Sequence, residues 1–217
     1  MSQRHDDRYT FEGTPLNPVD PGTNLLVAGP ILDGTRQTAL RLLAADPDDG
    51  IVVVAADTTA KEILADLDAL GCDVSGGRIR LVDCAQSGST GPEQFVSSVS
   101  SPADLTGIGM EFSGHYEEVY SRGYDAVRSG IYTLTPLLVF SEDTRPVFRF
   151  VNIVTSRIRT ADGLGVCVID PDAHEPQVVG SIAQSFDGRV DVRDGDDGPE
   201  IRVKGLPDQP TEWTPMR

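Results

Sequence analysis

The sequence predicts an α/β domain of three layers, with a mainly parallel central sheet and a C-terminal antiparallel hairpin. Short apolar runs alternate with segments of helical spacing along most of the 217 residues. Strands that are apolar at nearly every position are typical of a parallel sheet buried on both faces. The turn-rich stretch RDGDDGPE, at 193–200, separates two strand-like segments and predicts the hairpin.

The elements follow in order along the chain. We expect the core strands at Leu25–Ala28, Ile51–Ala56, Ser129–Leu134 and Leu164–Ile169, with a further strand at Arg78–Val82 and a hairpin of Arg189–Arg193 with Glu200–Val203. We expect helices at Thr35–Ala45, Thr59–Leu70, Pro146–Ile158 and Glu175–Ser185, the last capped by the segment Asp170-Pro-Asp172. The stretch from Cys84 to Phe112, rich in serine and glycine, breaks this rhythm and is interpreted as a long loop.

Charge is the clearest signal in the composition. The chain has 34 acidic and 18 basic residues, a formal net charge of −16, and only two lysines, Lys61 and Lys204. The acids are spread along the chain, which predicts a solvated acidic surface. Such a surface is expected of a protein that works in concentrated salt, where counterions screen self-repulsion. It argues against a nucleic-acid partner, which would require a basic face.

The sequence shows no signal for a membrane span, a signal peptide or a metal site. No stretch approaches the roughly 18–20 consecutive apolar residues of a membrane span, and the N-terminus MSQRHDDRYTFEG has no apolar signal region. We therefore expect a cytoplasmic protein. The three cysteines, Cys72, Cys84 and Cys167, lack the spacing of metal ligands, so we expect buried thiols and no metal site.

The stretch NLLVAGPILDGTRQTALRLLA, at 24–44, has the outline of a phosphate-binding loop between a strand and a helix. That loop requires Gly-x4-Gly-Lys-[Ser/Thr], because the lysine neutralises the outer phosphates and the hydroxyl holds magnesium. Here the glycines are Gly29 and Gly34, but Thr35 stands at the lysine position and Arg36 at the hydroxyl position, followed by Gln37. An ordinary strand-to-helix turn is the alternative interpretation.

Three segments together resemble the haloarchaeal branch of the RecA/KaiC-like ATPase superfamily, the small HTR-like proteins. They are NPVDPGTNLLVAGPILDGTRQTALRLL, ADLTGIGMEFS and TRPVFRFVNIVTSRIRTADGLGVCVIDPDAHEPQVVGSIAQSFDGRVDVRD. The resemblance spans residues 17 to about 193. It implies a RecA-like P-loop NTPase fold at 23–205, between an N-terminal extension at 1–22 and a tail at 206–217. It also implies a nucleotide site at the first strand–helix turn.

A second motif of this superfamily is an apolar strand that ends in an aspartate, whose carboxylate orders magnesium and water. The matching stretch SGIYTLTPLL places Tyr132 at that aspartate and Thr133 at the following serine. A tyrosine is neutral at pH 7 and supplies no negative charge. The resemblance therefore implies that both motifs, the phosphate loop and this Walker B strand, are degenerate.

Three functions remain open. The first is a pseudo-ATPase that serves as a regulatory or assembly scaffold in signalling, with a protein partner or a homo-oligomer, and with weak or no binding of ATP and Mg²⁺. The second is an ATPase with displaced groups, in which Arg36 supplies positive charge and Glu111, Glu117 or Glu118 acts as base or metal ligand. The third is a small-molecule enzyme on a Rossmann-like sheet with Asp57 as a ribose-binding acid, but the Gly-x-Gly-x-x-Gly fingerprint is absent.

Overall fold

The computed structural model describes residues 8–30, 33–44, 46–75, 77–84, 95–124 and 126–216. Within these residues, nine strands form one sheet, in the spatial order β4 (Val96–Ser98), β3 (Ile79–Asp83), β2 (Gly50–Ala55), β5 (Val127–Tyr132), β6 (Leu164–Ile169), β1 (Asn24–Ala28), β7 (Gly188–Gly195), β8 (Gly198–Lys204) and β9 (Thr214–Pro215). The strands from β4 to β7 pair in parallel. The last two pairings, β7 with β8 and β8 with β9, are antiparallel.

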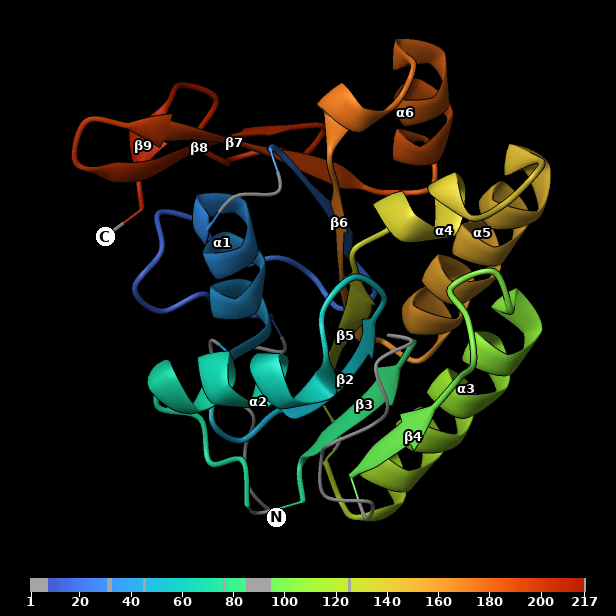
Figure 1. Ribbon diagram of the computed structural model, residues 1–217. Helices are drawn as coiled ribbons and strands as arrows, with labels where there is room; N and C mark the ends of the chain where they lie inside the picture. The colour runs from blue at the N-terminus through green and yellow to red at the C-terminus, as the bar shows by residue number, and fades with distance from the viewer. Residues whose placement is uncertain are drawn as a thin grey trace.

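The helices cover both faces of the sheet (Figure 1). They are α1 (Asp33–Ala44), α2 (Ala60–Ala69), α3 (Leu105–Ser121), α4 (Thr135–Val139), α5 (Thr144–Thr160) and α6 (Pro176–Ala183), with a short 3-10 helix, η1, at Pro171–Ala173. Helices α1 and α2 bury their apolar side chains on one face, and α3, α4, α5 and α6 bury theirs on the other. The predicted three-layer α/β fold with its mainly parallel sheet and C-terminal hairpin is confirmed.

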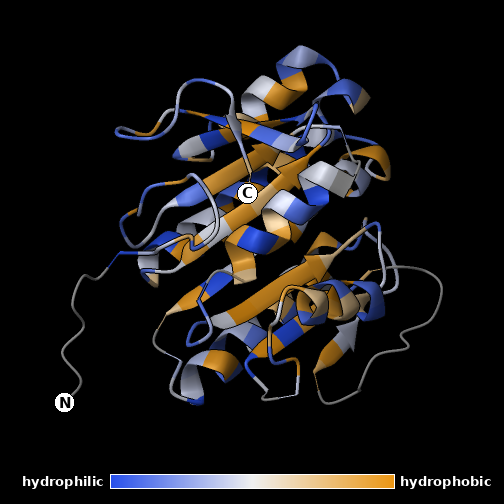
Figure 2. Cartoon of the chain, turned by 90° about the vertical axis from the view of Figure 1, so that its left-hand side faces the viewer, coloured by the Kyte–Doolittle hydropathy of each residue, from blue (hydrophilic) through white to orange (hydrophobic). Residues whose placement is uncertain are grey.

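The sheet is buried because its central strands carry apolar side chains toward both helical layers. All six residues of β2, GIVVVA, are buried, and so are all residues of β1 and β6. Figure 2 shows the strands as the most hydrophobic layer of the molecule. Strand β5 begins two residues earlier than expected, and Gly130 within it has a reason: a Cβ there would lie 1.6 Å from the carbonyl oxygen of Val166. Only glycine allows β5 and β6 to approach so closely.

Local sequence signals explain where the longer helices begin. At α2, Thr59 accepts a hydrogen bond from the backbone N–H of Glu62, and the Glu62 carboxylate accepts one from the N–H of Thr59, which is a capping box. Asp104 caps α3 by accepting from Gly107, and Asp143 caps α5 by accepting from Arg145. Helix α5 then buries apolar residues at helical spacing, which fixes the face it turns toward the sheet.

Two expectations about local structure are wrong. The stretch from Cys84 to Phe112 is not one long loop, because residues 96–98 form the edge strand β4 and α3 begins at Leu105. A three-residue strand and a helix that contains glycines both lack the periodic apolar pattern that sequence reading requires. The carboxylate of Asp170 caps η1 through the N–H of Asp172, and α6 begins without a side-chain cap at Glu175. Residues 85–94 lie outside the described residues.

The two ends of the described chain join the core. Tyr9, Phe11, Leu16 and Val19 are buried with the cluster on the α1–α2 side, and Met216 joins the same cluster. Trp213 docks on the outer strands, with the centroid of its ring 4.3 Å from the guanidinium carbon of Arg193 and 4.5 Å from that of Arg202. The three cysteines are buried and unpaired, as expected.

A buried ion pair ties the N-terminal segment to the sheet. Arg128 on β5 is fully buried, and its Nε donates to the Asp49 carboxylate at 2.6 Å. The same guanidinium donates to the backbone carbonyls of Leu42 and Thr10, each at 3.0 Å. These bonds satisfy a charge that would otherwise be very costly to bury.

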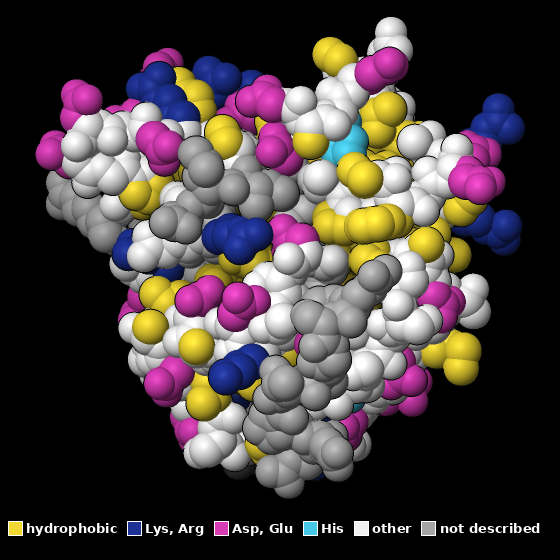
Figure 3. Space-filling view, in the orientation of Figure 1, with side chains coloured by type: hydrophobic (Ala, Val, Ile, Leu, Met, Phe, Trp, Pro, Cys, Tyr) yellow, Lys and Arg dark blue, Asp and Glu magenta, His cyan; other side chains and the backbone are white. Residues whose placement is uncertain are grey.

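The surface carries the excess of acids, and Figure 3 shows them spread over one face of the molecule. Among the described residues, no helix is both long enough and apolar enough to cross a membrane. The same residues contain no cluster of three or more metal-ligating side chains.

Candidate functional site

The predicted phosphate loop leaves the carboxyl end of β1, which lies between β6 and β7 in the sheet. Gly29 follows the strand, and its N–H donates to the carbonyl of Ile169 at 3.3 Å. A Cβ on Gly29 would lie 2.6 Å from the Thr35 hydroxyl oxygen and 2.8 Å from the Val192 carbonyl oxygen. Glycine is therefore required here by close packing of the chain on itself, whether or not a ligand binds.

The second glycine of the pattern, Gly34, lies in the first turn of α1. A Cβ there would come within 3.1 Å of an Asp194 carboxylate oxygen and 3.2 Å of the Pro199 Cβ, so the C-terminal hairpin packs beside the helix start. Helix N-termini attract anions through their free N–H groups, but the neighbouring Asp194 places negative charge at the same point. Residues 31 and 32 of the loop lie outside the described residues.

Thr35, at the lysine position of the pattern, faces the interior. Its residue is 2% exposed, and its hydroxyl oxygen lies close to Gly29. Thr38, one turn later, donates its hydroxyl to the carbonyl of Gly34 at 2.8 Å. Gln37 is exposed on the same turn. A residue at position 35 is therefore built into the packing of the loop, and a threonine there carries no charge toward solvent.

Arg36 binds a carboxylate within the chain. Its Nη2 lies 3.0 Å from an Asp57 carboxylate oxygen, just beyond the carboxyl end of β2, and the two side chains are 35% and 18% exposed. Burial raises the pKa of Asp57, and the positive charge of Arg36 opposes that rise. The Arg36 Nε is buried and has no hydrogen-bond partner among the described residues. The charge that the displaced-group hypothesis assigned to a phosphate is thus paired with an acid of the chain.

The next acids along this edge of the sheet hold the start of α2. Glu62 accepts from the N–H of Thr59 at 2.9 Å and from the hydroxyls of Thr58 and Thr59 at 2.7 and 2.8 Å. These bonds, the one from the N–H first, lower its pKa to about 2. The Asp83 carboxylate, at the end of β3, accepts from the N–H of Ala60 at 3.0 Å. These hydrogen bonds give Glu62 and Asp83 a structural role at the start of α2.

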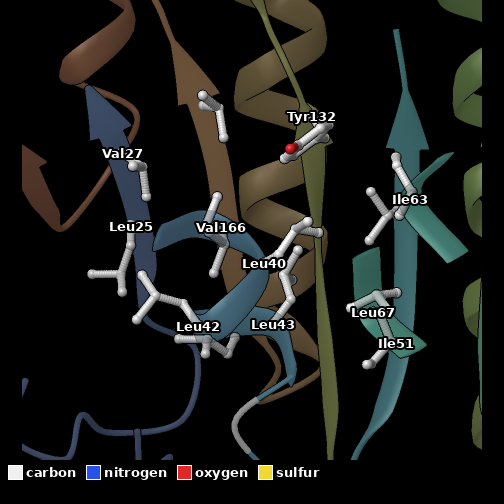
Figure 4. Close-up of a cluster of buried hydrophobic side chains, with 14 of the residues drawn as sticks. Leu25, Val27, Leu40, Leu42, Leu43, Ile51, Ile63, Leu67, Tyr132 and Val166 are labelled. Carbon is white, nitrogen blue, oxygen red and sulfur yellow. The ribbon is translucent and has the colours of Figure 1, made fainter. Parts of the chain in front are cut away.

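Tyr132, at the aspartate position of the second motif, is a core residue. It is 2% exposed and belongs to the cluster on the α1–α2 side. Figure 4 shows it among the aliphatic side chains of α1 and the central strands, near Leu40 and Val166. Thr133 is fully buried, and its hydroxyl accepts from the N–H of Thr135 at 3.0 Å. The carboxyl end of β5 therefore presents an aromatic ring and a hydroxyl.

The three glutamates proposed as displaced catalytic groups lie on α3. This helix packs on the sheet face opposite α1, so the structure does not bring them together with Gly29 and Gly34. Glu118 binds the buried Arg80 through two hydrogen bonds, at 2.8 and 2.9 Å, and binds Arg122 at 2.9 Å. Hydrogen bonds from Arg80, ahead of those from Arg122, lower the Glu118 pKa to about 2. Glu117 is exposed, and Glu111 is partly buried.

Sequence reasoning missed the pairing of Arg36 with Asp57. Both residues follow apolar strands that we expected to be parallel, and the carboxyl ends of parallel strands meet at one edge of the sheet. That geometry was the available signal for their contact. The contacts of Arg128 and Arg80 carried no comparable signal, because an arginine inside a predicted strand gives no indication of its partner.

The order of the strands and the loop after β1 define an α/β fold that this chain shares with solved archaeal proteins, one of them described as KaiC-like. A KaiC-like protein from the archaeon Pyrococcus horikoshii superposes with a TM-score of 0.65 at 10% identity, covering 96% of this chain and 93% of the other. An uncharacterized protein from the same organism, solved in complex with an unknown peptide, gives 0.63 at 12% identity, covering 86% and 84%. A third protein from that organism gives 0.60 at 13% identity, covering 90% and 93%.

The chain belongs to the family of unknown function DUF7504, whose model matches residues 22–192. A comparison with curated protein sequences finds no match. The structural similarity, at identities this low, defines the fold and leaves the activity to be argued from the site itself.

Proposed function

We propose that this chain is a RecA/KaiC-like domain without ATPase activity that serves as a regulatory or assembly scaffold in signalling. We further propose that it is cytoplasmic and works in concentrated salt. The observation that carries the proposal is the state of the two positions on which Mg-ATP chemistry depends. Thr35 is uncharged and 2% exposed, and Tyr132 is uncharged and equally buried. Phosphoryl transfer relies almost entirely on positioned charge, and these two positions supply none.

The surroundings of the loop support the same proposal. Arg36, the nearest cation in sequence, is bound to Asp57, and Asp194 adds negative charge beside the start of α1. A nucleotide triphosphate would have to compete with one carboxylate and bind near another. We therefore propose weak or no binding of ATP and Mg²⁺.

A protein partner is the natural consequence of a scaffold role. One structurally similar protein was solved in complex with a peptide, which makes peptide recognition a reasonable function for this fold. The excess of 34 acids over 18 bases disfavours nucleic acid as the partner. A homo-oligomer remains the second kind of assembly that we propose to test.

A second candidate is an ATPase with displaced groups, and one observation favours it. The Arg36 Nε is buried without a hydrogen-bond partner among the described residues, so this guanidinium retains a donor that an anion would satisfy. Its test is the variant Arg36→Ala. If the unmodified protein turns over ATP and the variant does not, the displaced-group hypothesis replaces the scaffold.

Restoring the missing groups is the constructive test of the scaffold proposal. We would compare Thr35→Lys, Tyr132→Asp and the double variant by calorimetric titration with Mg-ATP in molar KCl. Lysine and aspartate act on one bound Mg-nucleotide, so the double variant should improve binding by more than the two single changes combined. Additive or absent effects would mean that the loop no longer has the shape of a nucleotide site.

Matched controls separate charge from folding. Gln37→Lys adds the same positive charge at an exposed position of α1 and should leave binding unchanged. Tyr132→Phe keeps the volume of the buried ring without adding a carboxylate. Because Tyr132→Asp places a charge in the core, each variant must show a cooperative thermal transition above the assay temperature before its titration is interpreted.

A further inference from the structure

Helix α5 exposes a stripe of four residues that the nucleotide site does not use. Arg145, Arg149, Ile153 and Arg157 are spaced by four, so they lie on one side of the helix. All four are exposed, and Ile153 is 46% exposed. The distance from the first to the last of these residues along the helix is about 18 Å. Figure 1 shows α5 beside α3, on the side of the sheet away from α1.

This stripe lies between two hollows in the surface. One, of about 890 Å³, runs along α5 and is lined by the stripe with Phe148 and residues of the last helical turns. The other, of about 690 Å³, lies between α3 and α5. Arg149, Ile153 and Arg157 line both of them. We call the two hollows and the stripe between them the α3–α5 groove.

The charge of the groove is opposite to that of the chain as a whole. The lining of the larger hollow contains three arginines and no acid, and that of the smaller one contains a single acid, Glu117. Arg145, Arg149 and Arg157 form no salt bridge with any described residue. In contrast, other arginines of the described residues are paired with acids, including Arg36, Arg80, Arg128, Arg159, Arg189, Arg193 and Arg202. In a chain with nearly twice as many acids as bases, three arginines without an acidic partner on one stripe leave charge for a ligand to neutralise.

Helix α3 contributes an open, apolar wall to the groove. Met110 is 69% exposed, and Gly109, Ser113 and Gly114 lie beside it on the lining. A Cβ on Gly114 would meet no atom within 4 Å, so nothing in the packing of the chain requires glycine there. Glycine in the middle of a helix is destabilising. At position 114, glycine leaves the wall of the groove without a projecting side chain. Arg157 donates to the Ser113 hydroxyl and so lies across the groove.

We propose that the α3–α5 groove binds an acidic amphipathic helix of a partner protein. Carboxylates of that helix, spaced by four, would pair with Arg145, Arg149 and Arg157, and its apolar side chains would pack on Ile153 and Met110. Arginine offers several N–H donors to a carboxylate, and carboxylates are the complement that these three cations lack. The stripe matches three to four turns of a helix in length. This inference rests on the proposed scaffold role and names the chemistry of its partner, but it requires no nucleotide.

The test uses three synthetic peptides of about 18 residues that share one amphipathic helical pattern and differ only in the charged residue: glutamate, lysine or glutamine. Fluorescence anisotropy with the full chain measures their binding at several KCl concentrations. Circular dichroism checks that the chain is folded at each concentration. We expect the glutamate peptide to bind, the other two to bind about tenfold more weakly or not at all, and the affinity to fall as KCl rises.

Variants locate the binding. Arg149→Glu and Ile153→Asp should each weaken binding of the glutamate peptide about tenfold or more. Lys61→Glu makes the same charge change at an exposed position of α2, on the opposite face, and should leave binding unchanged. Equal binding of all three peptides, no binding of the glutamate peptide, or equal loss in Lys61→Glu would overturn the proposal. So would a dimer in sedimentation experiments that Ile153→Asp dissociates, because a second copy would then occupy the groove.

The outcomes of the nucleotide experiments are independent of the outcomes of the peptide experiments. If the unmodified protein hydrolyses ATP and the glutamate peptide still binds the groove, the pseudo-ATPase assignment is wrong and the docking surface stands. If neither ATP nor the peptide binds, the groove proposal is wrong and the degenerate site stands.

Discussion

Two regions of the molecule differ in whether their charged side chains are paired within the chain. They are the carboxyl edge of the sheet around Gly29 and the α3–α5 groove. At the edge, Arg36 is bound by Asp57, and Glu62 is bound by threonine hydroxyls and a backbone N–H. In the groove, Arg149 and its neighbours on the stripe have no acidic partner among the described residues. Charge that is neutralised within the chain positions helices and strands, whereas charge left without a partner is available to another molecule. The region that resembles a ligand site in sequence is therefore the more self-contained of the two.

The largest effect should come from breaking an internally neutralised pair. Arg128→Leu leaves Asp49 buried without its partner at 2.6 Å, and burial already raises the pKa of Asp49. We expect a loss of about 3–5 kcal/mol in the free energy of unfolding, measured by chemical denaturation. Arg149→Leu, on the groove, should change it by less than about 0.5 kcal/mol. Equal losses in the two variants would remove the distinction between the regions.

Salt should stabilise the folded chain by screening the acidic side chains that have no basic partner. The surplus of 34 acids over 18 bases creates repulsion that counterions screen. The melting temperature should therefore rise by several degrees as KCl increases from dilute to molar concentration. Thermal melts followed by circular dichroism provide the measurement. A flat or falling melting temperature would argue against an origin in concentrated salt.

Acid should weaken the fold through Glu118. Its pKa is lowered from 4.5 to about 2 in the folded chain, chiefly by the hydrogen bond from Arg80. The stability it contributes is present above about pH 4.5 and is lost as the pH falls toward 2. Unfolding curves across that range should show a smaller loss for Glu118→Gln than for the unmodified protein. Glu117→Gln, at an exposed position one residue earlier, should behave like the unmodified protein.

The smallest change concerns the wall of the groove. Gly114→Ala places a methyl group where no atom lies within 4 Å, so it should stabilise α3 by about 0.5–1 kcal/mol. If the groove binds a helix that approaches this wall, the same change should weaken binding of the glutamate peptide. A gain in stability without any effect on binding would place the peptide farther along α5.

The sequence was sufficient for the architecture because buried parallel strands carry a continuous apolar signal. The strands at Leu25–Ala28, Ile51–Ala56 and Leu164–Ile169 are found within a residue of their expected ends. The edge strand β4 escaped prediction because three residues with one buried side chain carry no periodicity. Helix α3 begins within the stretch that was interpreted as a loop, because glycines interrupt its apolar pattern.

The candidate site could be located from sequence but its contacts could not. The spacing of Gly29 and Gly34 identified the loop, and the absence of a lysine was visible at Thr35. That Thr35 faces inward and that Asp57 binds Arg36 depend on how the strand ends meet, which a single sequence does not encode locally. The groove gave no sequence motif at all, because its meaning depends on which arginines form salt bridges in the folded chain, and Arg145, Arg149 and Arg157 form none with the described residues.

The central proposal is that the loop after β1 has the two glycines of a phosphate site without the charged groups that bind Mg-ATP. The most direct measurement is titration of the unmodified protein with Mg-ATP in molar KCl, followed by an assay for released phosphate. The account predicts weak or undetectable binding and no turnover above the uncatalysed rate. Robust turnover that Arg36→Ala abolishes would contradict it.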